Sequence, residues 1–379
     1  MKVISIDGLS IQRFSSDTVV WDPSLLDSKE NAYQISRWME HHLFGKKLHL
    51  SIIIPVHNRE EHLKHCLRAL SNQTIDRSEY EIIVVDDGST DTSGEVGRLS
   101  GANVIQTPHR GPGAARNAGI AQAKGEITVF LDADIVVKPD YLESLRKRHS
   151  MTNNLLLLGA RRHLPEGVID DQAGNFRLDS REKLLKRYSY CLSHLNHPWS
   201  LAYTCNLSVP SYLLESVRFD ESFIGWGLED IDFAYQLYQK GVHIAFSRSL
   251  CGYHLYHDRT FTAARYQSWL QNLERLIRKH PAPSIQSFSL FKPVFNPEIQ
   301  ANYFEVFDQF EGRRPNLAAE ILDLSQGSED PLEQIQDWLI QNPGKQVALT
   351  DREERILYEV YLPFLGEGRI QSFIPKEEP

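Results

Sequence analysis

The chain has 379 residues, of which 41% are hydrophobic and 24% are charged. This composition is typical of a globular protein and excludes a wholly disordered chain. At about 150 residues per domain, the length predicts two to three domains. The formal net charge of −9 argues against non-specific binding to nucleic acid, because such binding depends on neutralising phosphates.

The four cysteines show no CxxC spacing, so we expect reduced thiols in a reducing compartment rather than a disulfide framework. Residues 1–10 lack the apolar core of a secretory signal. The apolar runs of the chain are far shorter than the roughly 20 residues that cross a bilayer. We therefore predict a soluble, cytoplasmic protein, and peripheral contact with the inner face of the cell membrane stays open.

The pattern of residues 1–47 is weak, with one helix expected at residues 28–44, and we interpret this segment as an N-terminal extension. From residue 48, short apolar runs rich in β-branched residues alternate with helical patterns. Such alternation is typical of a parallel sheet covered by helices on both faces. The expected strands are residues 50–55, 81–85, 103–106 and 127–131, and the expected helices are residues 60–73, 113–123 and 141–149.

A second half of the same α/β region extends to residue 280. Its expected helices are residues 181–195, 229–240 and 262–279, and its expected strands are residues 202–209 and 243–247. Helical patterns follow at residues 305–324, 332–341 and 352–361, without a chemical motif. We therefore expect an α/β domain at residues 48–280, with halves at 48–150 and 151–280, followed by a mainly helical region at 281–379.

Two adjacent acids end the second expected strand. Asp86 and Asp87 precede Gly88 and continue as Ser-Thr-Asp. Ligands of open α/β sheets bind beyond the carboxyl ends of the strands, where a carboxylate can accept a hydrogen bond from the N3–H of uracil. The alternative is an Asp-Gly turn with solvated acids. The run alone does not decide between a nucleoside site and a turn.

A second acidic motif, Asp132-Ala-Asp134, directly follows the expected strand at residues 127–131. Alternate residues of an extended segment point to opposite faces, so both acids cannot be buried without partners. A divalent cation that also contacts a diphosphate would be such a partner, since hard cations combine carboxylates with substrate phosphates. DxD triplets also occur by chance on surfaces. The position of this one after the Asp86-Asp87 run favours a metal site.

The third motif places Trp226 between Gly225 and Gly227, just before Glu229 and Asp230. Flanking glycines suit a hinged loop that closes an aromatic ring over a sugar. The acids begin a helix whose dipole favours negative charge at that end. Ordinary helix capping would explain the acids but not the tryptophan. We therefore favour a functional loop.

The fourth motif contains His254 and His257. The two histidines share a face if the segment is helical, and they do not if it is extended. A lone histidine is usually a core or surface residue, but two of them in a chain with a DxD motif indicate a metal ligand. Imidazole nitrogen suits first-row transition ions such as manganese. Other histidine pairs, including His62 and His65, lack an acidic companion motif, and we expect no function for them.

In this order the four motifs resemble the inverting nucleotide-sugar glycosyltransferases of family 2, which have the GT-A fold. The resemblance covers residues 48–260, about 210 of the 379 residues. It rests on SIIIPVHNREEHLKHCLRALSNQT, IIVVDDGSTD, GPGAARNAGIAQAKGEITVFLDADIVVKPDYL, FDESFIGWGLEDIDFAYQLYQKG and YHLYH. The WGLEDIDF part is similar to the C-terminal half of β-1,4-galactosyltransferases and of bacterial chondroitin polymerases. The resemblance implies a Rossmann-like, mostly parallel sheet with helices on both faces.

The resemblance also implies roles for single residues. The donor-binding residues would be Pro55, His57, Glu60 and Asp87 at the nucleoside, Gly113, Arg116 and Asn117 beside the diphosphate, and Asp132 at the ribose or the metal. Asp134 and His257 would be metal ligands for Mn²⁺ or Mg²⁺, with His254 as a second histidine ligand. Trp226 and Glu229 would contact donor and acceptor sugars. Asp230 would be the general base.

The implied reaction is a metal-dependent, inverting transfer of a hexose or N-acetylhexosamine from a UDP-sugar to a hydroxyl group. The galactosyltransferase-like motif favours galactose or N-acetylgalactosamine, and the acceptor would be a glycan, a lipid-linked molecule or a peptide. One alternative is a retaining enzyme of the polypeptide N-acetylgalactosaminyltransferase type, which usually has EN where this chain has Glu229-Asp230. Another is a non-catalytic sugar-nucleotide-binding protein. The flanking regions could bind the acceptor, a partner or a second subunit.

Overall fold

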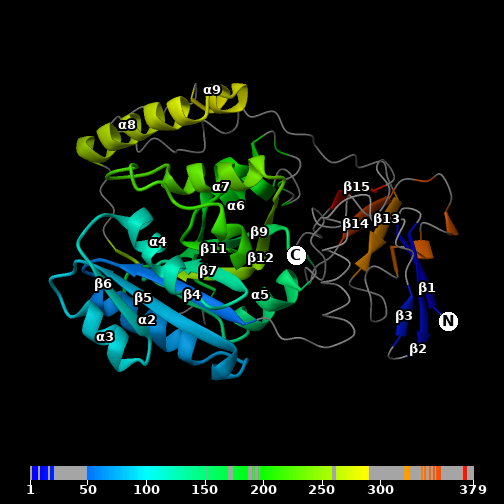
Figure 1. Cartoon of the computed structure of the whole chain (residues 1–379), viewed down its shortest axis with the longest axis horizontal. Coiled ribbons are helices and arrows are strands. Elements are labelled where there is room, and N and C mark those ends of the chain that lie inside the picture. The colour runs from blue at the N-terminus through cyan, green and yellow to red at the C-terminus, as the bar shows by residue number, and fades with distance from the viewer. Residues whose placement is uncertain are drawn as a thin grey trace.

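The computed structural model describes residues 49–289 apart from short gaps at 151, 170–173, 187–189, 191, 193–194, 196 and 258–261. It also describes residues 2–6, 9–15 and 18–20 and several short segments between residues 320 and 373. The largest body in Figure 1 is an α/β domain built from the first of these ranges.

A nine-stranded sheet forms the centre of this domain, in the order β6-β5-β4-β7-β11-β9-β12-β8, with β10 paired to β9. Strands β4, β5, β6 and β7 run parallel, and β12 runs parallel to β9. Strand β11 is antiparallel to both β7 and β9, and β8 is antiparallel to β12. The strands are β4 (Leu50–Val56), β5 (Tyr80–Asp87), β6 (Asn103–Thr107), β7 (Ile127–Leu131), β8 (Ile135–Val137), β9 (Leu155–His163), β10 (Arg177–Leu178), β11 (Asn206–Pro210) and β12 (His243–His254).

Helices cover both faces of the sheet (Figure 1). Consecutive residues of a strand point to opposite faces, so Ile53 packs in one core with α4, α6, α7 and α8, while Ile52 and Ile54 pack in a second core with α2 and α5. Burial on both faces explains why the strands are continuously apolar. The helices are α2 (Glu60–Ser71), α3 (Ser93–Leu99), α4 (Pro112–Gln122), α5 (Tyr141–His149), α6 (Ser180–Lys186), α7 (Glu229–Gln239), α8 (Ala263–Lys279) and α9 (Pro283–Ser289).

The sequence-based prediction of a mostly parallel sheet covered on both faces is confirmed. The four strands expected in the first half correspond to β4, β5, β6 and β7. One helix is shorter than expected: the pattern at residues 181–195 forms α6 only to Lys186. Tyr190 has a left-handed φ of 58°, which a continuing α-helix does not allow. Strands β8, β9 and β10 were not predicted.

The terminal segments form two small sheets. An antiparallel sheet contains β1 (Lys2–Ile6), β2 (Leu9–Ser15) and β3 (Thr18–Val20), and a parallel sheet contains β13 (Glu320–Asp323), β14 (Val347–Thr350) and β15 (Ile370–Phe373). The helix expected at residues 305–324 is therefore wrong for residues 320–323. A short apolar run does not distinguish a helix from a strand, and pairing with β14 decides here. The helices expected at 28–44 and 352–361 lie outside the described residues.

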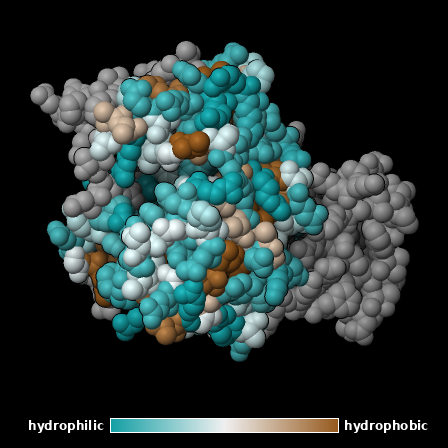
Figure 2. Space-filling model, turned by 60° about the vertical axis from the view of Figure 1, so that its left-hand side comes forward, coloured by the Kyte–Doolittle hydropathy of each residue, from teal (hydrophilic) through white to brown (hydrophobic). Residues whose placement is uncertain are grey.

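The surface of the α/β domain is mostly hydrophilic, with separate hydrophobic spots on the face drawn in Figure 2. Within the described part of the chain, no helix has the length and apolar character needed to cross a membrane. The exposed large hydrophobic residues of that part are Leu99, Ile169, Tyr212, Ile224, Trp226, Tyr238 and Tyr256. Ile224, Trp226 and Tyr256 belong to the third and fourth sequence motifs.

Candidate functional site

The ends of parallel strands bring the first two motifs together. Strands β4, β5 and β7 are hydrogen-bonded neighbours in parallel register, so their carboxyl ends lie at one edge of the sheet. His57 follows β4, Asp87 ends β5, and Asp132 follows β7. This edge is where open α/β sheets bind ligands.

The carboxylate of Asp87 is buried and holds the loop that leads into α4. Its Oδ1 accepts a hydrogen bond from the backbone N–H of Arg110 at 2.9 Å, and its Oδ2 accepts one from Gly111 at 2.9 Å. The Nδ1 of His109 also lies 2.9 Å from Oδ2. Gly88 has a φ of 71°, and a Cβ there would be 2.8 Å from the backbone nitrogen of His109. Asp87 therefore shapes this loop, and contact with a uracil stays a prediction.

The residues after β4 connect to the same loop. The Nδ1 of His57 donates to the backbone oxygen of Asp87 at 2.8 Å, and the ring of His57 stacks on His109 with 4.1 Å between centroids. Asn58 has a left-handed φ of 50° and accepts from the backbone N–H of Thr90 at 2.8 Å. The sequence analysis missed Asn58 and His109, and neither has a motif signal stronger than its position after a strand.

Pro55 and Glu60 lie before and after the short segment that connects β4 to α2. Pro55 is in β4, opposite Val85 of β5. Glu60 begins α2, where its carboxylate accepts from Lys64 at 2.7 Å and its backbone N–H donates to Asp91 at 3.1 Å. The hydrogen bond from Lys64 lowers the pKa of Glu60. In this structure the Glu60 side chain is thus engaged along its own helix.

Asp134, His254 and His257 converge as the sequence predicts. The Oδ2 of Asp134 lies 3.3 Å from the Nε2 of His254 and 3.1 Å from the Nε2 of His257. Of all groups within the described ranges, these three are the set that could hold a metal ion, with ligand atoms within 4.8 Å of one another. One carboxylate oxygen and two imidazole nitrogens suit a first-row divalent ion.

Pairing between β8 and β12 builds this cluster. His254 is paired with Ile135, the residue after Asp134, and the backbone N–H of Leu255 donates to the backbone oxygen of Asp134 at 2.9 Å. The chain leaves β12 after His254, so His257 reaches the same carboxylate from the following loop. His62 of α2 also lies here, with its Nε2 3.1 Å from the backbone oxygen of Tyr256. His62, for which the sequence predicts no function, therefore lies beside the loop that carries His257.

Arg116 connects the DxD motif to the third motif. Its guanidinium is buried, lying 3.1 Å from Oδ1 of Asp132 and 3.5 Å from Oε1 of Glu229. It also lies over the ring of Phe219 at 5.5 Å. A planar guanidinium can hold two carboxylates at once, which an ammonium group cannot do equally well. Arg116 therefore joins segments that are 113 residues apart in the sequence.

Two further residues of α4 also face the third motif. Gly113 lies in the first turn of α4, where a Cβ would be 3.5 Å from Cβ of Phe219. Asn117, one turn later, donates to the backbone oxygen of Phe219 at 2.8 Å and accepts from its N–H at 3.1 Å. Contacts with Phe219 before and after Arg116 in the sequence therefore fix the position of α4 against the loop that leads to α7.

The first turn of α7 places Glu229 and Asp230 beside Arg116. Glu229 pairs with Arg116, whereas Oδ1 of Asp230 accepts from the backbone N–H of Ile231 at 2.9 Å. Burial raises the pKa of Asp230 to about 8, and the neighbouring Glu229 carboxylate adds to this increase. Trp226, just before the helix, is 42% exposed. A partly buried carboxyl group with a raised pKa is suited to proton transfer near neutral pH.

A buried cluster of ion pairs lies next to His254, one of the three candidate metal ligands. Asp179 accepts from Arg161 at 2.7 Å and from Arg181 at 3.3 Å, and the ring of His163 lies 5.2 Å from that of His254. The two arginines lower the pKa of Asp179 against the effect of its burial. This cluster could not be predicted from the sequence, because Arg161, Asp179 and Arg181 form no recognisable motif.

The contacts described above gather most of the predicted site residues into two groups. One group surrounds Asp87, and the other joins Asp134, the histidines, Arg116 and the first turn of α7. Glu60 and Asp87 have their carboxylates engaged by protein groups, while Asp132 and Trp226 are substantially exposed.

Comparison with known proteins shows which family and which proteins this chain resembles. Residues 51–205 match the family model described as glycosyl transferase family 2. Validoxylamine A glucosyltransferase of Streptomyces hygroscopicus subsp. limoneus is 32% identical over 260 residues, which are 62% of this chain and 57% of that protein. Chondroitin synthase of Escherichia coli is 30% identical over 238 residues, which are 54% of this chain and 34% of that protein. The chain spans less than two thirds of the length of either relative.

Among solved structures, S. aureus TarS 1–349 in complex with UDP-GlcNAc is similar, with a TM-score of 0.47 and 21% identity. The alignment covers 61% of this chain and 67% of that one. The observed mixed, mostly parallel sheet with helices on both faces is a GT-A-like fold, as the motifs implied. Residues 51–205, which contain the strand ends and the acidic motifs described above, are therefore similar to glycosyl transferase family 2.

Proposed function

We propose that this protein transfers a hexose or N-acetylhexosamine from a UDP-sugar to a hydroxyl group of a glycan or similar acceptor, with inversion at the anomeric carbon. The observation that carries the proposal is the convergence of Asp134, His254 and His257 beside a buried arginine that bridges Asp132 and Glu229. The curated relatives are named as a glucosyltransferase and a chondroitin synthase, which supports a hexose or hexosamine donor.

Asp134, His254 and His257 would hold a divalent ion, Mn²⁺ or Mg²⁺. Their mixed oxygen and nitrogen donors lie close enough to bind one ion together. When bound, such an ion supplies positive charge that neutralises the departing diphosphate. Arg116 is the nearby protein cation, and its two carboxylate partners keep it in place.

Asp230 would act as the general base that removes the acceptor hydroxyl proton. Its carboxyl group lies in the first turn of α7, next to Glu229, and burial keeps its pKa near the range where proton transfer is efficient. A single displacement by the activated oxygen inverts the anomeric carbon, so the chain needs no covalent nucleophile. Trp226 would offer its exposed ring to a sugar, with galactose or N-acetylgalactosamine as the favoured donor sugars because of the WGLEDIDF motif.

The test is transfer by the purified chain with Mn²⁺ and a panel of UDP-sugars, using Asp230→Asn as the diagnostic variant. We expect Asp230→Asn to bind donor normally in calorimetry while its transfer rate falls by a factor on the order of 10² to 10⁴. The anomeric proton signal in an NMR spectrum of the fresh product should show that the configuration at the anomeric carbon is inverted relative to the donor. Normal turnover by Asp230→Asn would remove this residue from the base role, and a retained configuration would reject the inverting mechanism.

A further inference from the structure

The turn that carries Trp226 is held in an unusual backbone conformation. Gly225, Gly227 and Leu228 have φ values of 79°, 90° and 75°. Glycine adopts such angles freely, but leucine rarely does because its Cβ approaches the following carbonyl oxygen. Strain of this kind persists only where the surrounding structure determines the conformation. The residues that fix this turn are therefore part of how the site is built.

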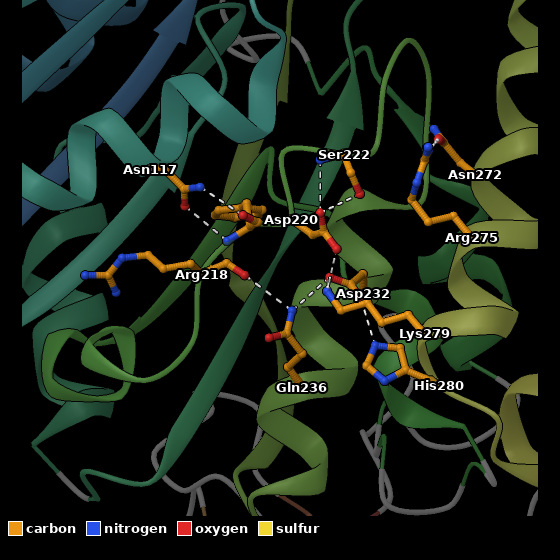
Figure 3. Close-up of polar contacts among 11 residues, drawn as sticks. Asn117, Arg218, Asp220, Ser222, Asp232, Gln236, Asn272, Arg275, Lys279 and His280 are labelled. Atoms are coloured by element: carbon orange, nitrogen blue, oxygen red, sulfur yellow. Dashed lines mark hydrogen bonds and ion pairs between the residues drawn. The ribbon is translucent and has the colours of Figure 1, made fainter.

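Asn272 of α8 binds both sides of the turn. Its Nδ2 donates to the backbone oxygen of Ile224 at 3.2 Å and to that of Gly227 at 2.9 Å. Its Oδ1 accepts from Arg275 at 3.1 Å, which settles which end of the amide faces the turn. The Asn272 side chain is buried, and Figure 3 shows it with Arg275 on α8. A single amide thus sets the spacing between the residues that flank Trp226.

The surface of α8 also fits closely against the turn. A Cβ on Gly225 would lie 2.3 Å from Oγ of Ser268, and a Cβ on Gly227 would lie 3.0 Å from Cδ1 of Trp269. Neither position leaves room for a larger residue. The two glycines therefore serve close packing against α8 as well as the backbone angles, and the turn cannot shift without disturbing α8.

The C-terminal end of α8 holds the first turn of α7 (Figure 3). Asp232 is fully buried, and its Oδ1 accepts from Nε2 of His280 at 2.7 Å. Its Oδ2 accepts from Nζ of Lys279 at 2.9 Å, and Lys279 also reaches Asp220 at 2.8 Å. Removing one partner of such a buried charge network is strongly unfavourable. The third acid of the WGLEDIDF motif thus binds α8, only two residues after Asp230.

We propose that α8 is the positioning helix of the site. Asn272 fixes the turn that presents Trp226, and Lys279 with His280 fixes, through Asp232, the helix turn that presents Asp230. None of these four residues touches the reacting groups in the proposed function, on which this inference rests. They act by fixing the position of the Trp226 turn relative to the start of α7.

The first test replaces Asn272 with leucine, which has the same branching but no donor. Ile224 is exposed and Gly227 is half-buried, so the variant is expected to fold. We expect the acceptor KM to rise or kcat to fall by about 10- to 100-fold, with donor affinity in calorimetry changed less than about twofold. The matched control is Asn154→Leu. Asn154 is also a buried asparagine, and its side chain donates to the backbone oxygen of Gly241 near the first residue of β9.

A second readout does not depend on activity. Acrylamide quenching of the Trp226 fluorescence, obtained by difference from Trp226→Phe in each background, should change in Asn272→Leu and not in Asn154→Leu. Unchanged quenching and unchanged acceptor kinetics in Asn272→Leu would overturn the inference. If the wild-type chain transfers no sugar at all, the proposed function fails, but the quenching experiment still decides whether α8 positions the turn.

The second variant pair tests the other end of α8. Glutamine in place of His280 can donate an N–H from a similar position, whereas leucine cannot. We expect His280→Gln to keep kcat within about threefold of wild type and His280→Leu to lose about tenfold or more, both with normal donor affinity. Equal losses in the two variants, or loss of donor binding together with kcat, would contradict a positioning role for this pair.

Discussion

At the scale of single residues, the fold changes the ordinary chemistry of Asp230. The sequence places it among three acids in the first turn of α7, and only the folded structure distinguishes them. Glu229 is paired with Arg116 and Asp232 with Lys279 and His280, whereas Asp230, which is half-buried, forms no such ion pair among the described residues. Loss of hydration raises the pKa of Asp230, and the neighbouring Glu229 carboxylate raises it further.

This raised pKa predicts the pH dependence of the reaction. A general base works only without its proton, so kcat/KM should rise with pH through a midpoint at about pH 8 and level off above it. A steady-state profile from acidic to alkaline pH measures this. A rate that is already constant from pH 5 upward would mean that no group with a raised pKa limits the reaction.

The same residue predicts a stability change of known sign. The folded state binds the Asp230 proton more tightly than the unfolded state, so its contribution to stability is lost as pH rises from about 4 to about 8. Asparagine has no proton to lose. Urea unfolding should therefore show Asp230→Asn gaining stability relative to wild type between pH 5 and pH 8. A constant difference across that range would contradict the pKa shift.

At the scale of elements, α4 and α7 are joined through one buried side chain. Arg116 leaves the middle of α4 and reaches Asp132 after β7 and Glu229 at the start of α7. Asn117 supports the same contact by binding the backbone of Phe219 on both sides. The donor half and the acceptor half of the proposed site therefore depend on a guanidinium of fixed geometry.

We expect Arg116→Lys to weaken this connection, because different guanidinium nitrogens contact Asp132 and Glu229 and lysine has a single nitrogen to replace both. The predicted result is a loss of kcat of about tenfold or more, with a lower urea midpoint. Arg148→Lys is the matched control, since Arg148 is also buried on a helix but bonds Ser249 and Ser144 away from the site. Equal effects of the two substitutions on kcat would show that Arg116 has no special role.

At the scale of the whole molecule, the site exists because two halves of one sheet meet. The parallel strands β4 to β7 supply the DxD motif, and β12 returns beside β8 to supply the histidines. A ligand that needs both halves should stabilise the native state by mass action. Metal binding can therefore be measured on the intact chain without knowledge of the acceptor.

Mn²⁺ with UDP should raise the thermal midpoint of the wild-type chain, and a chelator should reverse the increase. At a ligand concentration about 100 times its Kd, the stabilisation would be about 2.7 kcal/mol. His257→Ala should lose most of the metal-dependent increase, because it removes one of three ligands. His65→Ala, on α2 and outside the cluster, should keep it. Equal increases in both variants would reject the metal site.

The sequence by itself predicted the strands that correspond to β4, β5, β6 and β7 and the acidic motifs at the ends of β5 and β7. These features are local, because each depends on apolar periodicity or on a motif of a few residues, whereas the grouping of Asp134 with two histidines was implied by the family resemblance. Only the tertiary structure decided that Asp87 holds a loop, that Arg116 bridges two motifs and that Asp232 binds α8. Each of these depends on contacts between residues far apart in the chain. The role of a charged side chain is set by the partners that folding places beside it.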